Sequence, residues 1–442
     1  MSTLARLRGG QLAGARRLDL NEGLEQFPRE IFDLADTLEV LNLSGNRLSA
    51  LPADLHRLRR LKVIFGSDNR FTSLPEVLGD CPALTTVGFK SNQIDEVPGC
   101  ALPPRLRWLI LTDNRVGRLP AVLGERPDLE KLMLAGNRLH KLPDSLQASH
   151  HLALLRIAAN EFDSVPRWLA DLPRLAWLGY GGNPCTMQAE AARLATPGIP
   201  RRPWATLALQ EVLGEGASGL IHRAALAGES TPDVAVKLFK GRMTSDGLPA
   251  SEMAAWLAAG SHDSIIPVRA VVADHPQGQP GIVMPLVDAE FMTLAGPPSM
   301  DSCSRDVYPA ERRFTVGLAW RIARHLAQAT AHLHARGILH GDLYAHNTLW
   351  RADGRSLLGD FGAASFLPAG DAAFSRALQG LEARAFGCLL QELSTRSEAA
   401  TPDEIATLGA MHALQAQCLA LLPGERPLFT HIAAALEACG DA

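Results

Sequence analysis

Two short motifs in the second half of the chain bring together the oxygen-bearing side chains that suit chemistry on phosphates. One reads His340-Gly-Asp-Leu-Tyr-Ala-His-Asn347 and the other reads Leu358-Gly-Asp-Phe-Gly362. Their acidic and amide residues are Asp342, Asn347 and Asp360. Mg²⁺ prefers hard oxygen ligands of this kind when it lies between the phosphates of a nucleotide. If these were ordinary turn residues, both motifs, their order and their spacing would be coincidental.

A glycine-rich segment and a lysine precede those motifs. Leu213-Gly-Glu-Gly-Ala-Ser-Gly-Leu-Ile221 can form a turn that lies over phosphates without Cβ clashes, although such a turn alone is weak evidence. Lys237 follows in Ala235-Val-Lys237, where apolar neighbours indicate a buried strand rather than an exposed edge. Glu252, fifteen residues later in a helical run, is either the partner of that lysine or a solvated helix residue.

Taken in order, these segments resemble a eukaryotic-type protein kinase. The resemblance implies that the chain transfers the γ-phosphoryl group of ATP with the help of Mg²⁺. Asp342 would orient and deprotonate the acceptor hydroxyl, and Asn347 and Asp360 would hold the metal. Lys237 would grip the α- and β-phosphates and pair with Glu252.

The resemblance also implies an adenine site around a hinge. Ile282-Val-Met284-Pro-Leu-Val287 is similar to that hinge, with Met284 as gatekeeper. The carbonyl of Pro285 and the amide of Val287 would then meet the base, and proline loses nothing at a position where only its carbonyl is needed. The other residues expected to contact ATP are Leu213, Gly214, Gly216, Gly219, Ile221, Ala235 and Leu349.

Further segments match the family. Trp256, His340 and Phe361 hold positions of its internal apolar stack, although each is also consistent with ordinary core. Residues 382–387 and 424–429 are similar to two conserved segments of its large lobe.

The sequence departs from the family at the catalytic loop. Gly341 replaces the arginine that precedes the catalytic aspartate, so we expect activity without phosphorylation of the activation segment. Tyr344 replaces a cation near the γ-phosphate, which predicts slow turnover or another cation in its place. Only 22 residues separate Asp360 from Glu382, which leaves little of the platform that binds peptides. Arg426 also lacks its usual glutamate partner unless Glu382 serves.

These departures keep three functions open. The first is a serine/threonine-type protein kinase, which the glycine loop, Ala-Val-Lys, Asp-Phe-Gly and residues 424–429 favour. The second is a phosphotransferase for small molecules of the aminoglycoside or choline type, which shares His-Gly-Asp-Leu and lacks the peptide platform. The third is an inactive scaffold, against which the retained metal and phosphate residues argue.

The first 185 residues repeat. Asparagines recur at steps of 23 residues with one step of 22, around which apolar residues recur five and three positions earlier, and a degenerate copy at 18–28 brings the number to about eight. The region resembles leucine-rich repeats of the short class. Each repeat contributes a short strand whose leucines only stacking can bury, and each asparagine satisfies backbone groups where the strand turns. The asparagines are Asn46, Asn69, Asn92, Asn114, Asn137, Asn160 and Asn183.

Residues flanking the strand leucines face the concave side of such a solenoid. They form a contiguous band with two tryptophans, which indicates either a surface that binds a substrate or regulator protein or a surface covered by the kinase-like half. The predicted partner-binding residues are Phe65, Trp108, Ile110, Met133, Arg156 and Trp177.

Three parts therefore follow one another. Residues 1–185 are predicted to form an α/β solenoid, 186–204 a capping helix and a proline-rich linker without strands, and 205–442 an α+β bilobal kinase-like domain. The predicted strands are Leu207–Leu213, Val234–Phe239, Val268–Val272 and Gly281–Val287. The predicted helices are Met187–Leu194, Leu318–Arg336, Ala383–Leu393, Ile405–Leu421 and Thr430–Ala438.

Composition and charge limit the partners and the cellular compartments that we expect. The formal net charge of −4 gives no reason to expect a nucleic-acid partner, and no run approaches the length of a membrane span. Seven scattered cysteines without a CxxC pair favour a reducing compartment. We therefore expect a cytoplasmic protein, with secretion as an effector left open. The abundance of alanine and arginine points to a bacterial source.

Overall fold

A computed structural model describes residues 2–196, 198–216, 218–227, 234–241 and 243–438 of the chain. The chain divides into two compact units, Met1–Leu172 and Pro173–Ala442. Within the described ranges, no helix is both long enough and apolar enough to cross a bilayer.

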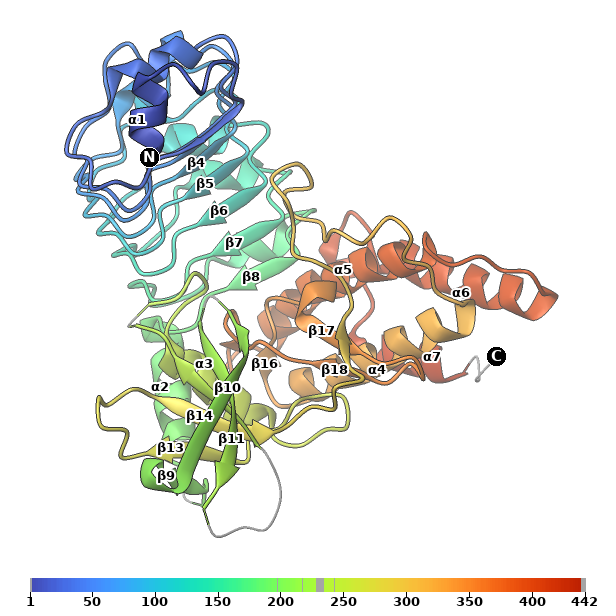
Figure 1. Cartoon of the computed structure of the whole chain (residues 1–442). Coiled ribbons are helices and arrows are strands. Elements are labelled where there is room, and N and C mark those ends of the chain that lie inside the picture. The colour runs from blue at the N-terminus through green and yellow to red at the C-terminus, as the bar shows by residue number, and fades with distance from the viewer. Residues whose placement is uncertain (1, 197, 217, 228–233, 242, 439–442) are drawn as a thin grey trace. The chain divides into compact units, whose positions relative to one another are not determined.

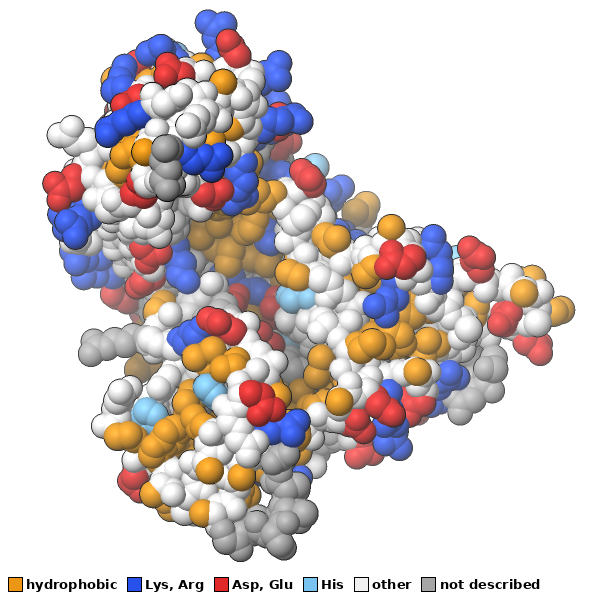
Figure 2. Space-filling view, viewed as in Figure 1, with side chains coloured by type: hydrophobic (Ala, Val, Ile, Leu, Met, Phe, Trp, Pro, Cys, Tyr) orange, Lys and Arg blue, Asp and Glu red, His pale blue; other side chains and the backbone are white. Residues whose placement is uncertain are grey.

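The first unit is a ladder of short parallel strands (Figure 1), each contributed by one repeat. Oppositely charged side chains are interspersed over the face of this unit that is visible in the upper part of Figure 2. Helix α1 (Thr3–Arg8) precedes the ladder. The strands are β1 (Arg17–Asp19), β2 (Val40–Asn42), β3 (Val63–Phe65), β4 (Thr86–Gly88), β5 (Trp108–Ile110), β6 (Lys131–Met133) and β7 (Leu154–Arg156). The 3₁₀ turns that return the chain are η1 (Arg29–Leu34), η2 (Leu55–Arg57), η3 (Glu76–Leu78), η4 (Gly99–Ala101), η5 (Ala121–Glu125), η6 (Asp144–Ala148) and η7 (Arg167–Asp171).

The asparagine of each repeat ties neighbouring turns together. Asn114 accepts a hydrogen bond from the amide of Ile94 at 3.0 Å and donates to the carbonyls of Phe89 at 2.9 Å and Leu111 at 3.0 Å. Leu109 in the middle of β5 (Trp108–Ile110) and Leu111 directly after the strand are fully buried. The predicted solenoid, with leucines in its core and asparagines satisfying backbone groups, is therefore confirmed.

The second unit begins with the last repeat. Strand β8 (Trp177–Gly179) is followed by helix α2 (Pro184–Leu194), which starts three residues before the predicted capping helix. The prediction that the proline-rich linker forms no strand is wrong, because Arg201–Pro203 forms β9 and pairs in parallel with β13 (Ala270–Ala273). An edge strand has a neighbour on one side only, so the missing N–H of Pro203 costs no ladder hydrogen bond.

A six-stranded sheet and a helical part make up the rest of this unit (Figure 1). The order of the sheet is β10-β11-β12-β14-β13-β9. Its remaining strands are β10 (Leu207–Glu215), β11 (Gly219–Leu226), β12 (Val234–Phe239) and β14 (Gly281–Pro285), with η8 (Trp204–Thr206) before them and helix α3 (Pro249–Ala259) between β12 and β13. The helical part contains α4 (Val316–Ala335), α5 (Ala372–Ser394), α6 (Pro402–Cys418) and α7 (Phe429–Ala438). Short elements between them are β15 (Met292–Thr293), β16 (Ile338–Leu339), η9 (Ala345–Asn347), β17 (Thr348–Trp350), β18 (Ser356–Leu358), β19 (Ser365–Phe366) and η10 (Pro423–Glu425).

The predicted bilobal arrangement, a strand-rich lobe followed by a helix-rich lobe, is confirmed. Each predicted strand and helix of this part overlaps an observed element, and β12 has the predicted bounds. The largest difference is α5, which begins at Ala372 rather than Ala383. Its N-cap is Asp371, whose side chain accepts from the amide of Phe374 at 2.9 Å.

Candidate functional site

Strand β12 and helix α3 bring the predicted lysine and glutamate together. Lys237 and Glu252 form a buried ion pair between Nζ and Oε1. The ammonium group also lies 5.4 Å from the centroid of the Trp256 ring. Burial raises the pKa of Glu252 above its ordinary value, although the charge of Lys237 opposes this. The alternative of a solvated glutamate at this position is therefore wrong.

The glycine-rich segment forms the turn between β10 and β11. The amide of Gly216 donates to the carbonyl of Gly219 at 3.0 Å. A Cβ atom on Gly219 would lie 2.5 Å from the carbonyl oxygen of Leu238, so only glycine lets β11 approach β12 this closely. Leu213 is 43 % exposed, and no atom lies within 4 Å of a Cβ built on Gly214 or Gly216.

The predicted adenine residues lie on neighbouring strands. In the register of β12 and β14, Ala235 pairs with Met284, and Ile221 on β11 pairs with Lys237. Met284 is buried at 3 % exposure, and Pro285 and Val287 after it are half-buried. Leu349 lies in the other lobe on β17 and is half-buried.

The three predicted phosphate and metal residues come from two connected loops. Asn347 donates from Nδ2 to the carboxylate of Asp342 at 2.8 Å and to its carbonyl at 3.0 Å. The backbone carbonyl of Asn347 accepts from the amide of Gly359, the neighbour of Asp360, at 3.2 Å. Asp360 adopts a left-handed backbone (φ 52°), and its Oδ1 accepts from the amide of Gly362 at 3.1 Å. A residue of this type is held at positive φ only where its surroundings enforce it.

Glu382 on α5 anchors the loop of residues 340–347, which is named the catalytic loop after the family that it resembles. Its fully buried carboxylate accepts from the amides of Gly341 at 2.7 Å and His340 at 3.2 Å, and it contacts Nε2 of His334 at 2.7 Å. The possibility that Glu382 pairs with Arg426 is not realised, since the Arg426 guanidinium donates to the carbonyls of Ala420, Gly380 and Pro173. Sequence reasoning named Glu382 but missed this role.

An internal apolar stack connects the two lobes. The rings of Trp256 on α3 and Phe361 lie 5.1 Å apart and nearly parallel, and His340 lies 5.2 Å from Phe361. Nε2 of His340 contacts the carbonyl of Gly359 at 3.0 Å, and its Nδ1 accepts from the amide of Asp342 at 3.3 Å. The predicted contact among the three aromatic residues is thus present.

Negative charge accumulates around this loop. His346 contacts Asp306 through Nδ1 at 2.7 Å and through its backbone amide at 3.1 Å. Burial alone would lower the pKa of His346, but the hydrogen bond to Asp306 and the charges of Asp306, Asp342 and Asp360 raise it overall. Sequence reasoning missed the pair of His346 and Asp306. The one signal for it in the sequence is that a histidine stands next to Asn347.

The predicted partner-binding residues differ in exposure. Phe65, Trp108, Ile110 and Met133 are half-buried, and Nζ of Lys131 lies 4.4 Å from the centroid of the Trp108 ring. Arg156 is buried at 1 % exposure and Trp177 at 2 %. Trp177 stacks on Tyr344 of the catalytic loop, with ring centroids 4.2 Å apart and planes at 8°, so it offers no free surface.

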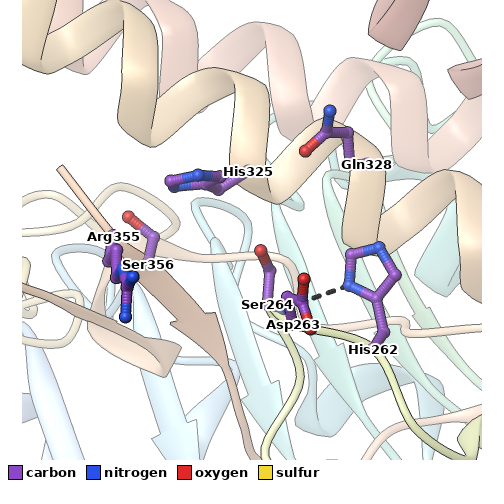
Figure 3. A pocket seen from close by; sticks show the side chains of 7 residues that line it. All are labelled: His262, Asp263, Ser264, His325, Gln328, Arg355 and Ser356. Carbon is purple, nitrogen blue, oxygen red and sulfur yellow. Dashed lines mark hydrogen bonds between the residues drawn. The ribbon is translucent and has the colours of Figure 1, made fainter.

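A cavity of about 620 Å³ is lined by none of the predicted site residues (Figure 3). It is lined by His262, Asp263, Ser264, His325, Gln328, Arg355 and Ser356. Nδ1 of His262 accepts from the amide of Ser264 at 3.1 Å, and burial lowers the pKa of both His262 and His325. The cavity therefore contains neutral imidazoles at neutral pH and none of the predicted site residues.

Comparison with known families agrees with both units. Residues 207–384 match the family described as protein tyrosine and serine/threonine kinase, and residues 37–58 match a leucine-rich repeat.

Relatives cover the chain only in part. The serine/threonine-protein kinase PITSLRE of Drosophila melanogaster is 28 % identical over 213 residues, which is 48 % of this chain and 21 % of that one. The serine/threonine-protein kinase mos of Xenopus laevis is 30 % identical over 174 residues, 38 % of this chain and 45 % of that one. The probable inactive serine/threonine-protein kinase roco10 of Dictyostelium discoideum is 32 % identical over 114 residues, 25 % of this chain and 4 % of that one.

Each match covers less than half of the relative's own length. All three sources are eukaryotic, so a bacterial origin stays a prediction. The chain therefore joins a region that matches a leucine-rich repeat to a region that matches the protein tyrosine and serine/threonine kinase family.

Proposed function

We propose that the chain is an ATP-dependent protein kinase that phosphorylates serine or threonine, with its repeats as the module that recognises proteins. The observation that carries this proposal is the closed arrangement of the site: Lys237 pairs with Glu252 while Asn347 holds the carboxylate of Asp342. A domain that only bound partners would have no need for either contact.

The residues fit a direct transfer of the γ-phosphoryl group. The Asp342 carboxylate accepts the proton of the acceptor hydroxyl while the hydroxyl oxygen forms a bond to the γ-phosphorus. The bond from that phosphorus to the β–γ bridging oxygen breaks, and ADP leaves with the electron pair. Lys237, held by Glu252, orients the α- and β-phosphates, and the turn containing Gly216 covers them.

The same residues fit a divalent cation. Asp342, Asp360 and the amide of Asn347 supply hard oxygens. Burial raises the pKa of Glu252 and the charge of Asp360 adds to this, while Asp306, Asp342 and Asp360 raise the pKa of His346 against the effect of burial; this indicates negative charge that a cation would balance. Bound Mg²⁺ would neutralise charge that develops on the phosphates. Asn347 and Asp360 are the residues that we propose as its ligands.

The repeats supply a surface for the protein partner. Ile110 and Met133 are neighbours across β5 and β6, and Phe65 on β3 belongs to the same column of concave residues. These half-buried apolar side chains, with Trp108 beside them, are the part of the predicted band that we propose for binding a substrate or regulator protein.

The test is transfer of label from γ-labelled ATP by the full chain with Mg²⁺. One reaction contains a generic protein, and a parallel reaction contains aminoglycosides and choline. Asp342→Asn and Asp360→Ala should each lower transfer at least about 10³-fold. Asp353→Asn, an exposed aspartate paired with Arg351, is the matched control and should behave as wild type.

The outcomes separate the candidate functions. Label on serine or threonine of protein that both variants abolish supports the proposal, and label on tyrosine would overturn its residue specificity. ATP consumption only with the small molecules would favour the small-molecule phosphotransferase, in line with the short stretch from Asp360 to the start of α5. No turnover with either would leave the inactive scaffold.

A further inference from the structure

We propose that Pro173–Leu194, which we call the brace, is an integral part of the catalytic domain. It comprises strand β8 of the last repeat and helix α2, and both belong to the second compact unit. Trp177, Tyr180 and Glu190 act as positioning residues for the catalytic loop, the activation segment and helix α3. The inference rests on the proposed kinase function and assigns the last repeat a task other than recognition.

The brace holds the catalytic loop through Trp177. Its ring stacks in parallel on Tyr344, and its Nε1 donates to the carbonyl of Leu343 at 3.1 Å. Leu343 directly follows Asp342, so this hydrogen bond fixes the backbone next to the proposed base. Trp177 is 2 % exposed and Tyr344 is 4 % exposed, so the contact excludes water from both rings.

The backbone of the brace also explains why position 341 is glycine. Gly341 has φ +74°, and a Cβ atom there would lie 2.6 Å from the carbonyl oxygens of both Leu178 and Ala363. The arginine that this position holds in related kinases would therefore collide with the last repeat. Both departures from the family, at 341 and 344, lie where the brace contacts the loop.

The activation segment is held by Tyr180. Its amide donates to Oγ of Ser365 at 2.9 Å, and its hydroxyl donates to the carbonyl of Phe366 at 2.9 Å. Ser365 and Phe366 form β19, which pairs with β16 immediately before the catalytic loop. A segment ordered by these two hydrogen bonds and by its pairing with β16 does not need a phosphate and an arginine to order it.

Helix α2 fixes the helix that carries Glu252. The buried carboxylate of Glu190 accepts from Oγ of Ser251 at 2.7 Å and from the amide of Gly182 at 2.8 Å. Arg193 donates to the carbonyl of Leu257 at 3.1 Å, six residues further along α3 than Ser251. Because Ser251 adjoins Glu252, a shift of α2 would move one member of the ion pair with Lys237.

The opposite interpretation is that the last repeat blocks the catalytic loop. In the docked arrangement, however, Lys237 and Glu252 are paired, and Trp256, Phe361 and His340 are stacked. These contacts require both lobes and both loops in place. Their presence together with the brace favours positioning over inhibition.

The test compares two tryptophans, one in the brace and one in the first unit, in the full chain. Trp177→Ala should lower kcat about 10-fold or more while KM for ATP changes less than about 3-fold, because the loop and not the nucleotide site is displaced. Trp177→Phe keeps the stacked ring and should recover most of kcat. Trp168→Ala, on η7 in the first unit and outside the proposed partner-binding band, should leave kcat on a generic protein unchanged. Wild-type or increased kcat in Trp177→Ala would overturn the proposal.

Two further measurements separate positioning from misfolding and from failure of the kinase proposal. Glu190→Gln should lower kcat several-fold while the chain stays folded at the assay temperature, since its single amide oxygen can replace only one of the two oxygens that accept from Ser251 and from the amide of Gly182. Hydrogen exchange at the amides of His340 and Gly341, which bond to Glu382, should accelerate in Trp177→Ala and not in Trp168→Ala. If the wild type transfers no phosphate, the kinase proposal fails and the exchange rates alone decide whether the brace exists. Unchanged exchange would reject it.

Discussion

The first seven repeats and the last one share a sequence pattern but use it differently. Trp108 and Trp177 each open the strand of their repeat. Trp108 is half-buried with Lys131 over its ring, whereas Trp177 is buried against Tyr344. The repeat pattern therefore predicts where a side chain lies on its strand, but the element packed against the strand decides its task.

The asparagines show the same contrast. Asn114 bonds to backbone groups of its own and the preceding repeat. Asn183 donates to the carbonyl of Tyr180 at 2.8 Å and forms a capping box with Thr186 at the start of α2. One residue type thus closes a repeat in the first unit and starts a helix in the second.

The largest expected effect comes from cutting the chain at each of the two boundaries. The compact unit begins at Pro173, whereas the sequence places the start of the kinase-like domain at residue 205. We expect a fragment 173–442 to retain transfer to a generic protein and a fragment 205–442, which lacks the brace, to lose it about 10²-fold or more. Equal activity of the two fragments would support the domain boundary at residue 205 that the sequence predicts.

A glycine pair gives the next largest effect. Gly341→Ala places a Cβ 2.6 Å from two carbonyl oxygens at a positive φ, so kcat should fall about 10²-fold and Tm should decrease. Gly117→Ala in the first unit is the matched control, because its Cβ would meet one carbonyl oxygen at an ordinary 3.9 Å. Steady-state kinetics and thermal unfolding measure both. An active Gly341→Ala would show that Leu178 does not confine this loop.

An asparagine pair separates stability from activity. Asn114→Ala should destabilise the first unit by about 2–3 kcal/mol, since it leaves buried backbone groups without partners, and should leave kcat unchanged. Asn183→Ala should cost about 1 kcal/mol through loss of the cap and should lower kcat several-fold through Tyr180 and α2. Urea unfolding and kinetics of each variant check this. An equal effect of both on kcat would remove the distinction between the two regions.

The smallest effect concerns pH. Burial raises the pKa of Glu392 to about 7, although Arg305 opposes this, and Asp306 and Tyr308 adjoin it. A carboxyl whose folded pKa is raised favours the folded state at low pH, and this contribution is lost as pH rises from about 4.5 to about 7. Glu392→Gln should remove about 2 kcal/mol of the change in the free energy of unfolding that the second unit shows across this pH window.

The first unit offers a control of opposite sign. The hydrogen bond from Arg29 lowers the pKa of Asp54, so its contribution is present above the unfolded pKa and is lost as pH falls from that value towards the lower folded pKa. Unfolding followed from pH 3 to pH 8 should therefore show that Asp54→Asn changes the pH dependence of stability only at the acidic end, whereas Glu392→Gln changes it between about 4.5 and about 7. A pH response of Glu392→Gln confined to acid would contradict the raised pKa.

Periodic features were predictable from sequence because they follow from local chemistry. The repeat strands and the bounds of β12 come from apolar patterns, and the pairing of Lys237 with Glu252 comes from spacing within a known motif order. Strand β9 was missed because proline argues against strands in general, and only its edge position removes the cost. The early start of α5 was missed because the residues between Asp360 and Glu382 were interpreted as a shortened platform for peptide substrates.

Contacts between distant segments were not predictable in the same way. Nothing near Trp177 indicates that Tyr344, far along the chain, would cover it. The available signal was indirect: a glycine and a tyrosine replaced two cationic residues of the family at 341 and 344. Two such replacements close together are informative, because another element of the fold must fill the space that the family's cationic side chains would occupy.

Strand β9 keeps the brace close to the catalytic loop even when the two are not in contact. Because β9 is paired with β13, the brace is joined by a short connection to the sheet that it serves. If the brace leaves the catalytic loop, it remains nearby at an effective concentration on the order of millimolar, so a soluble competitor would have to exceed that concentration to replace it. A single proteolytic cut between Leu194 and Arg201 would remove this advantage. The activity of the cut protein would then depend on dilution, whereas the activity of the intact chain would not.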